Sequence, residues 1–177
     1  MPSDEFAIPK DRVAVAIGPN GGTKKAVEKA TQTKIRIDSK NGDVEIEGED
    51  AAIVLKAANI VRAIGRGFSP EHAMKLVDDE YYFELINLSE ELGKSWKQIQ
   101  SKKGRIIGKE GTIRQKIEAD TQTHISVYGK TIGLIGKADN VEKARHAVLM
   151  LIKGAEHASV LNYLRQSHTN DEEFEFR

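Results

Sequence analysis

"IGKEGTIRQKIEADTQTHISV", residues 107–127, repeats a stretch that lies 90 positions earlier, "IGPNGGTKKAVEKATQTKIRI", residues 17–37. The two stretches align without a gap and are identical at eight of 21 positions. Average composition would produce only about one or two matches. Similarity at a fixed spacing is typical of a duplicated structural unit. The sequence therefore predicts two homologous domains.

Both copies predict the same order of elements after the glycine pair. "TKKAVEKAT" and "TIRQKIEAD" each keep one apolar face and expose their charges, which is the pattern of a short helix. "KIRID" and "HISVY" alternate apolar and polar residues, and "NGDVEIEG" and "GKTIGLIG" return as second strands. Asn41-Gly42 is typical of a two-residue hairpin turn.

A longer apolar helix is expected to close each copy, over residues 51–64 and 140–152. Asp50 and Asp139 stand where N-cap residues are expected. The expected helix stops are glycines, namely Gly65 and Gly67 in the first copy and Gly154 in the second.

The segments outside the copies complete the expected organisation. "RVAVAIG", residues 12–18, alternates like a strand, and "YYFELINL", residues 81–88, is aromatic and β-branched enough to be one. Ser69-Pro70 can begin a short helix in the segment between the copies. The expected division is a first domain, a structured linker, a second domain with a C-terminal helix, and a loose acidic tail, at residues 1–66, 67–80, 81–166 and 167–177.

Composition excludes several classes of function. The 177 residues contain no cysteine, which rules out disulfides, cysteine-ligated zinc and a thiol nucleophile. The five histidines show no metal-ligand spacing, so no metal or cofactor is expected. No apolar run approaches the roughly 20 residues of a membrane span. A soluble, intracellular and cytoplasmic protein is therefore expected.

The net charge of zero conceals two basic regions. Residues 102–116 carry six cations and one carboxylate, a net charge of +5, and residues 22–36 carry five cations and one carboxylate, a net charge of +4. Acidic residues gather elsewhere, in residues 43–50, in the linker and in the tail. Such basic patches favour nucleic acid through release of counterions.

The glycine pairs at 18 and 21 and at 108 and 111 suit a phosphate. Glycine lets the backbone turn sharply and lets another chain approach closely. A helix that begins directly after the turn adds unpaired N–H groups and a partial positive charge. The sequence therefore predicts a phosphate-contacting loop in each copy.

Ile-Gly-x-x-Gly, a short helix and an apolar strand together resemble the KH domain, and two such units cover nearly the whole chain. The resemblance implies an α+β fold of two tandem type I KH domains, each a three-stranded antiparallel sheet packed with three helices. It also implies that "RVAVAIG" is a helix rather than a strand. A KH domain binds single-stranded nucleic acid, with the GxxG loop on the backbone of about four nucleotides and the bases in an apolar groove.

Residues 104–154 resemble the second KH unit of the ribosome-assembly family that partners the Nob endonuclease. The complete GxxG at residues 18–21 and the lack of a long N-terminal extension resemble the archaeal members. The resemblance implies an RNA-binding factor, not an enzyme, that holds the 3′ region of small-subunit precursor rRNA. It implies as partners that rRNA, the Nob-type endonuclease and a translation initiation factor subunit.

The residues expected to bind RNA are those of the two loops with their basic and apolar neighbours. They are Lys102, Lys103, Arg105, Ile107, Gly108, Lys109, Glu110, Gly111, Thr112, Ile113, Arg114 and Ile125 in the second unit, and Gly18, Pro19, Asn20, Gly21, Lys24 and Lys25 in the first. Pro19 and Asn20 depart from the family pattern, because KH loops usually carry a basic residue there. We therefore expect the second unit to contribute more RNA affinity.

Three alternatives stay open at this point. The first unit can dock a protein while the second holds RNA, or the chain can be a general KH regulator of messenger RNA. A nuclease or phosphotransferase would need a metal or nucleophile cluster, and none is visible.

"GKS" at residues 93–95 is not a P-loop, because Leu88 stands where that motif needs glycine. Trp96 is expected to pack beside the second unit, with stacking on RNA as the less favoured alternative.

Overall fold

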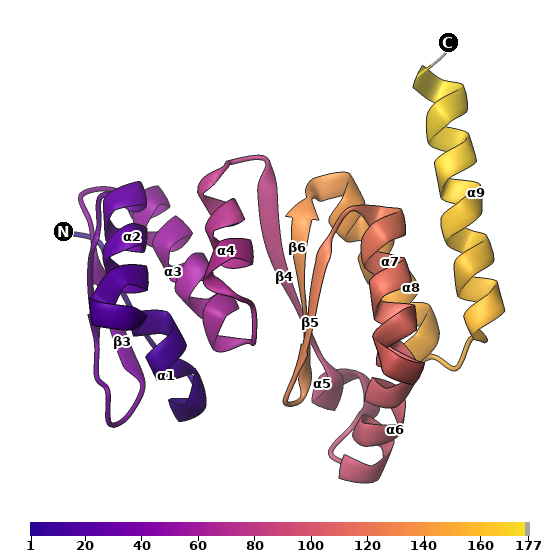
Figure 1. The fold of residues 1–177 in the computed structure, drawn as a ribbon, viewed down its shortest axis with the longest axis horizontal. Helices are drawn as coiled ribbons and strands as arrows, with labels where there is room; N and C mark the ends of the chain where they lie inside the picture. Colours follow the sequence, from indigo (N-terminus) through magenta and orange to yellow (C-terminus); the bar gives the residue numbers. More distant parts are fainter. Residues whose placement is uncertain (176–177) are drawn as a thin grey trace. The chain divides into compact units, whose positions relative to one another are not determined.

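The computed structural model describes residues 1–175, with side chains through His168. The chain divides into two compact units, Met1–Phe83 and Glu84–Arg177. Each unit holds a three-stranded antiparallel sheet whose third strand in the sequence lies between the other two, in the orders β1-β3-β2 and β4-β6-β5. Figure 1 shows that the helices of each unit cover one face of its sheet. This is the expected α+β fold of two type I KH units.

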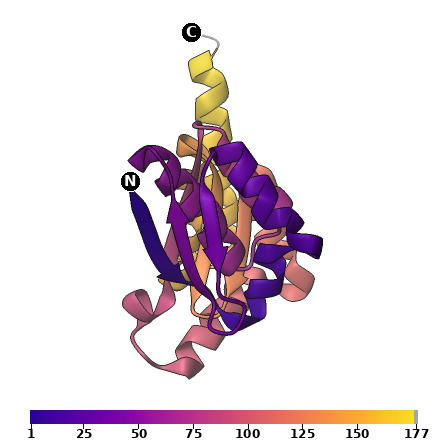
Figure 2. The same cartoon turned by 90° about the vertical axis from the view of Figure 1, so that its left-hand side faces the viewer.

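The elements of the first unit follow the order strand, helix, loop, helix, two strands and helix. They are β1 (Ser3–Ala7), α1 (Lys10–Ile17), η1 (Pro19–Gly21), α2 (Gly22–Thr31), β2 (Lys34–Ile37), β3 (Asp43–Glu47), α3 (Ala51–Gly65), α4 (Pro70–Ala73) and η2 (Met74–Val77). Figure 2 looks onto the sheet of this unit from the side away from its helices.

The second unit repeats this order with an added helix near its start and another at its end. Its elements are β4 (Tyr81–Asn87), α5 (Leu88–Leu92), α6 (Trp96–Ile107), η3 (Lys109–Gly111), α7 (Thr112–Thr121), β5 (His124–Tyr128), β6 (Thr131–Lys137), α8 (Ala138–Ile152) and α9 (His157–Glu175).

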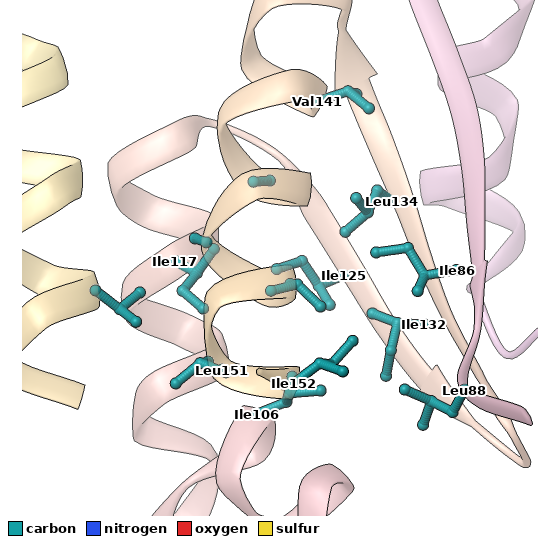
Figure 3. Packing of buried hydrophobic residues seen from close by; sticks show 14 of the residues in the cluster. Ile86, Leu88, Ile106, Ile117, Ile125, Ile132, Leu134, Val141, Leu151 and Ile152 are labelled. Carbon is teal, nitrogen blue, oxygen red and sulfur yellow. The ribbon is translucent and has the colours of Figure 1, made fainter. Parts of the chain in front are cut away.

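The core of the second unit is aliphatic and lies between the sheet and the helices (Figure 3). Leu134 from β6, Ile106 from α6 and Ile117 from α7 are completely buried. Val160 and Leu164 of α9 join the same cluster, so burial of apolar surface attaches the first half of α9 to the unit. The helical backbone continues through residues 167–175, where the sequence indicates a loose tail, because propagation of an existing helix costs little. Residues 176–177 lie outside the described part.

The strand expected from the alternation of "RVAVAIG" is wrong, because this segment is the helix α1. Val13 and Ala16 are its buried residues, three apart, which is a helical spacing that the alternation concealed. The resemblance to the KH domain predicted this helix correctly. The strand expected over residues 81–88 is confirmed as β4.

The expected helix boundaries are confirmed at two positions and wrong at one. The side chain of Asp50 accepts a hydrogen bond from Ala52 N and begins α3, and that of Ser69 accepts one from His72 N ahead of α4. Asp139 is not an N-cap, because α8 begins one residue earlier, at Ala138. A carboxylate in the first turn still interacts favourably with the helix dipole.

The hairpin between β2 and β3 is longer than Asn41-Gly42 alone predicts. Five residues, 38–42, separate the strands, and the side chain of Asp38 accepts hydrogen bonds from the backbone of Lys40 and Asn41. This Asp-centred turn stabilises the wider loop. The second unit has the two-residue connection instead, at Gly129-Lys130.

Candidate nucleic-acid interface

The two glycine loops have the same backbone conformation. Gly18 and Gly108 both have φ of 75°, with ψ of 171° and 178°. The third loop residue is left-handed in each, at φ of 55° in Asn20 and 57° in Glu110. Gly21 has φ of 72° and Gly111 has φ of 76°. The duplicated sequence therefore gives duplicated loop geometry.

The two glycines of each loop have different structural roles. A Cβ on Gly18 would lie 2.3 Å from Thr23 Oγ1, and one on Gly108 would lie 2.4 Å from Ile113 Cγ1. A Cβ on Gly111 would meet nothing closer than Arg114 Nη2 at 3.9 Å. The first glycine thus permits close packing of the loop on the following helix. The second leaves an open backbone surface that a ligand can approach.

The loop residues between the glycines differ in what they offer an anion. Lys109 is exposed and brings both a side-chain ammonium and a backbone N–H. Pro19 occupies the matching position and has neither group. Successive N–H groups in such a turn form anion-binding concavities. The first loop therefore lacks one donor of this concavity in addition to lacking a cation.

A lysine from the following helix partly replaces the missing charge of the first loop. Lys25 Nζ donates a hydrogen bond to Asn20 O at 3.3 Å. The matching residue in the second unit is the uncharged Gln115. The cation therefore reaches the first loop from α2, whereas the second loop carries its own in Lys109.

Lys24 and Arg114 lie at matching positions and form matching ion pairs. Lys24 Nζ lies 3.1 Å from Glu28 Oε1, and Arg114 pairs with Glu118. The other oxygen of each glutamate accepts a hydrogen bond from the strand that follows the helix, here called the groove strand (β2 or β5). Glu28 accepts from Ile35 N at 3.0 Å, and Glu118 accepts from Ile125 N at 3.2 Å. The glutamates tie the helix to the strand and reduce the local positive charge. Sequence reasoning missed this role, although both glutamates are identical positions of the repeat.

Two of the three cations before the second loop, Lys102 and Arg105, lie against residues 154–155. Arg105 donates to Ala155 O, and its Nε is buried without a hydrogen-bond partner, which favours a structural role in holding the connection between α8 and α9. Lys102 Nζ lies beside Gly154, 3.8 Å from where a Cβ would be. Lys103 is half-buried on α6. Thr112 is at the loop, where its hydroxyl donates to Lys109 O at 2.8 Å.

The apolar groove candidates separate by exposure. Ile107 and Ile113 are half-buried beside the loop, which leaves part of each side chain accessible. Ile125 is only 5% exposed, so very little of its side chain is accessible to a base. The matching residue of Ile113 in the first unit is the polar Thr23. The second unit therefore has the more apolar wall next to its loop.

The duplicated Thr-Gln-Thr step is a turn between helix and strand, with its threonines buried and its glutamine exposed. Gln32 and Gln122 end their helices in the left-handed conformation, with φ of 54° and 53°. The flanking threonine hydroxyls bond to each other, at 2.7 Å in the first unit and 2.8 Å in the second. The first threonine of each pair also donates to the carbonyl four residues earlier. The step fixes where the groove strand begins.

Two features bear on other classes of function. Among the residues with described side chains, no three histidines, aspartates or glutamates gather where they could hold a metal ion. Within the described helices, none has the length and apolar character that crossing a membrane requires.

Comparison with family models assigns both units. Residues 82–169 match the model described as eukaryotic type KH-domain (KH-domain type I), and residues 3–63 match the model described as KH domain.

Known proteins similar to this chain come from archaea and eukaryotes. A KH domain-containing protein of Methanocaldococcus jannaschii is 47% identical over 163 residues, covering 90% of this chain and 71% of the relative. The RNA-binding protein PNO1 of Oryzias latipes is 31% identical over 139 residues, covering 76% of this chain and 57% of that protein. The chain thus spans little more than half the length of this eukaryotic relative.

A solved structure of similar fold comes from Pyrococcus horikoshii. A chain in the crystal structure of its a/eIF2alpha-aDim2p-rRNA complex has a TM-score of 0.88 and 44% sequence identity. The match covers 96% of this chain and 95% of that chain.

The fold and the two glycine loops define a tandem type I KH protein, in the class that binds single-stranded RNA. The relatives identify the family within this class to which the chain belongs. The chain belongs to the two-KH-domain family of ribosome-assembly proteins, which includes the pre-rRNA-processing PNO1 proteins.

Proposed function

We propose that this protein holds the single-stranded 3′ region of small-subunit precursor rRNA during its maturation, with the second unit as the main clamp. The observation that carries the proposal is the loop at residues 108–111. Its second glycine is open to approach, and Lys109 is exposed beside it. The presence of rRNA in the complex of the P. horikoshii neighbour supports the choice of RNA.

In the proposed complex, the loop contacts the RNA backbone and the groove receives the bases. The start of α7 presents N–H groups and the positive end of its dipole toward a phosphate. Ile107 and Ile113 offer apolar contacts to the bases beside it. This role requires no bond cleavage, so a separate nuclease performs the processing step.

A second candidate function is that of an adaptor whose first unit docks a protein. The weaker anion site of the first loop favours it, together with the acidic outer face of the first sheet. On that face Glu5, Asp43 and Glu45 line one hollow, and Arg36 pairs with Glu45 at 3.1 Å. The a/eIF2alpha in the complex of the neighbour supports a translation initiation factor subunit as the partner. A Nob-type endonuclease is the other proposed partner.

The test is crosslinking of the protein to RNA in its own cells, followed by mapping of the bound nucleotides. Enrichment at the 3′ end of small-subunit rRNA is expected. Recovery mainly of messenger RNA would contradict the proposal and favour a general KH regulator. Incubation of the purified protein with precursor rRNA and divalent metal is expected to leave the RNA intact. Cleavage that scales with protein and survives repurification would contradict the non-enzymatic role.

A further inference from the structure

Trp96, the only tryptophan of the chain, is exposed at the first position of α6. Its exposed fraction is 55%, so the expected packing beside the second unit covers only part of the indole. The neighbouring residues Lys94, Ser95 and Lys97 are also exposed. Tryptophan is enriched at binding interfaces, because its ring offers a large apolar area together with a polar N–H.

The indole ring is placed against a cation from another element. Lys130 Nζ lies 5.8 Å from the ring centroid of Trp96, within the range of a cation–π interaction. Lys130 belongs to the two-residue turn between β5 and β6, and its carbonyl accepts a hydrogen bond from Leu88 N at 2.8 Å. The short turn therefore fixes the backbone from which the Lys130 side chain reaches the ring.

Charged residues of both signs lie near Trp96 in the sequence, and the nearest of them are lysines. Lys94 and Lys97 flank Trp96 on its own segment, and Lys130 faces its ring. The carboxylates of the preceding helix are those of Glu90 and Glu91. Proteins bind single-stranded nucleic acid with aromatic rings, on which the bases stack, and with nearby cations, which attract the phosphates.

Trp96 and the glycine loop lie at opposite ends of one helix. α6 runs from Trp96 to Ile107, and Gly108 follows directly, so the helix separates the two by roughly 17 Å. The first unit has no such arrangement. α1 begins at Lys10 directly after Pro9, so the start of this helix carries no aromatic side chain.

We propose that Trp96 and Lys130 form a stacking platform for one base of single-stranded RNA, outside the nucleotides held at the glycine loop. This inference rests on the proposed RNA-binding function and extends its binding site along α6. The platform adds affinity without reading sequence, because every base has a π face. RNA is favoured over a protein partner because Lys130 lies beside the indole and the exposed Lys94 and Lys97 flank Trp96 in the sequence.

Tyr82 is a matched control for exposed aromatic surface. Its exposed fraction is 54%, nearly that of Trp96. It lines a hollow together with Asp78 and Asp79, whose carboxylates repel RNA. Replacement of Tyr82 therefore removes an equally exposed ring without removing a site for a base.

The experiment uses the full chain and 3′-region rRNA oligonucleotides of about four and about twelve nucleotides. Trp96→Ala is expected to weaken binding of the longer RNA about 5- to 100-fold and to leave the short RNA within about two-fold. Trp96→Phe should recover part of the loss, and Tyr82→Ala should change neither affinity. The longer RNA should quench the fluorescence of Trp96, and an abasic strand of equal length should not.

The outcomes separate this inference from the proposed function. If Lys109→Asp with Glu110→Asp weakens binding of both RNAs while Trp96→Ala weakens neither, the platform is overturned and the loop site stands. Absence of quenching at saturating RNA overturns the platform as well. If the wild-type chain binds neither RNA, the proposed function fails, and the platform fails with it.

Discussion

The loops at residues 18–21 and 108–111 follow the same backbone path, yet they differ in what they offer a phosphate. The second contains Lys109 and its N–H, whereas the first contains Pro19, which lacks both groups. Lys25 reaches the first loop from the next helix and bonds to Asn20 O. The comparison shows that backbone geometry survived duplication while the anion-binding groups did not. We therefore expect the two units to differ in RNA affinity although they share a fold.

The glycines of the second loop provide the largest expected effect. Gly108→Val should lower the free energy of unfolding of the second unit by about 3 kcal/mol or more, from backbone strain and overpacking. The new Cβ would lie 2.4 Å from Ile113 at a φ of 75°. Gly111→Ala should cost about 1–2 kcal/mol, from its left-handed backbone alone. Urea unfolding followed by Trp96 fluorescence reports on this unit. Equal losses for the two variants would contradict the division of tasks between the glycines.

Charge reversal at the loops gives the next effect. Lys109→Asp with Glu110→Asp should weaken RNA binding about 10- to 100-fold, because a carboxylate replaces the ammonium at the phosphate. Pro19→Asp with Asn20→Asp should weaken it less than about three-fold, since the first loop contributes less. Fluorescence anisotropy with a labelled 3′-region RNA measures both variants. A larger loss from the first-loop pair is the result that contradicts this ranking.

Salt dependence sharpens the same comparison. Lys109→Gln should lower the slope of log K against log salt by about 0.7, the release expected for one phosphate contact on a single strand. Pro19→Lys should raise the slope by a similar amount if the new ammonium engages RNA, because it restores the cation that the first loop lacks. Titrations at several salt concentrations measure the slopes. Unchanged slopes for both variants would exclude these loop positions as phosphate contacts.

The threonine pairs should show the smallest effect. Thr121→Val and Thr31→Val should each lower the free energy of unfolding by about 1 kcal/mol, because each variant removes a hydroxyl that bonds to two buried groups. Thr112→Val, at an exposed hydroxyl, should cost less than about 0.5 kcal/mol. Urea unfolding monitored by circular dichroism measures all three. A larger loss at Thr112 than at Thr121 would argue against the buried turn.

Sequence reasoning was most accurate where local chemistry and the repeat agreed. The helices after both loops, the groove strands and the N-cap at Asp50 were all predicted. It was wrong at α1, where alternation indicated a strand, because the burial that selects a helix comes from packing against α3. It expected Trp96 to pack beside the second unit, and more than half of that side chain is exposed. Exposure depends on neighbours from other elements, and one segment does not reveal them.

The candidate site shows the same division. The positions of the loops, the lysine in the second loop and the lack of a cation in the first loop follow from the residues alone. The pairing of Arg114 with Glu118 and the hydrogen bond of Arg105 to Ala155 do not follow from the residues alone. These partners depend on how the helices pack against strands and against other helices. Lys25 rather than Lys24 lies at the first loop for the same reason, since Glu28 and the groove strand hold Lys24.

The sequence by itself determined that this protein has two units, where their glycine loops lie and which loop carries a cation. Those properties are local, because a glycine pair, a helix start and a charge each act within a few residues. Only the tertiary structure decided which cations remain available to RNA, which isoleucines stay accessible and that Trp96 stands exposed beside Lys130. Burial and pairing are set by residues far apart in the chain, so they emerge only when the elements pack.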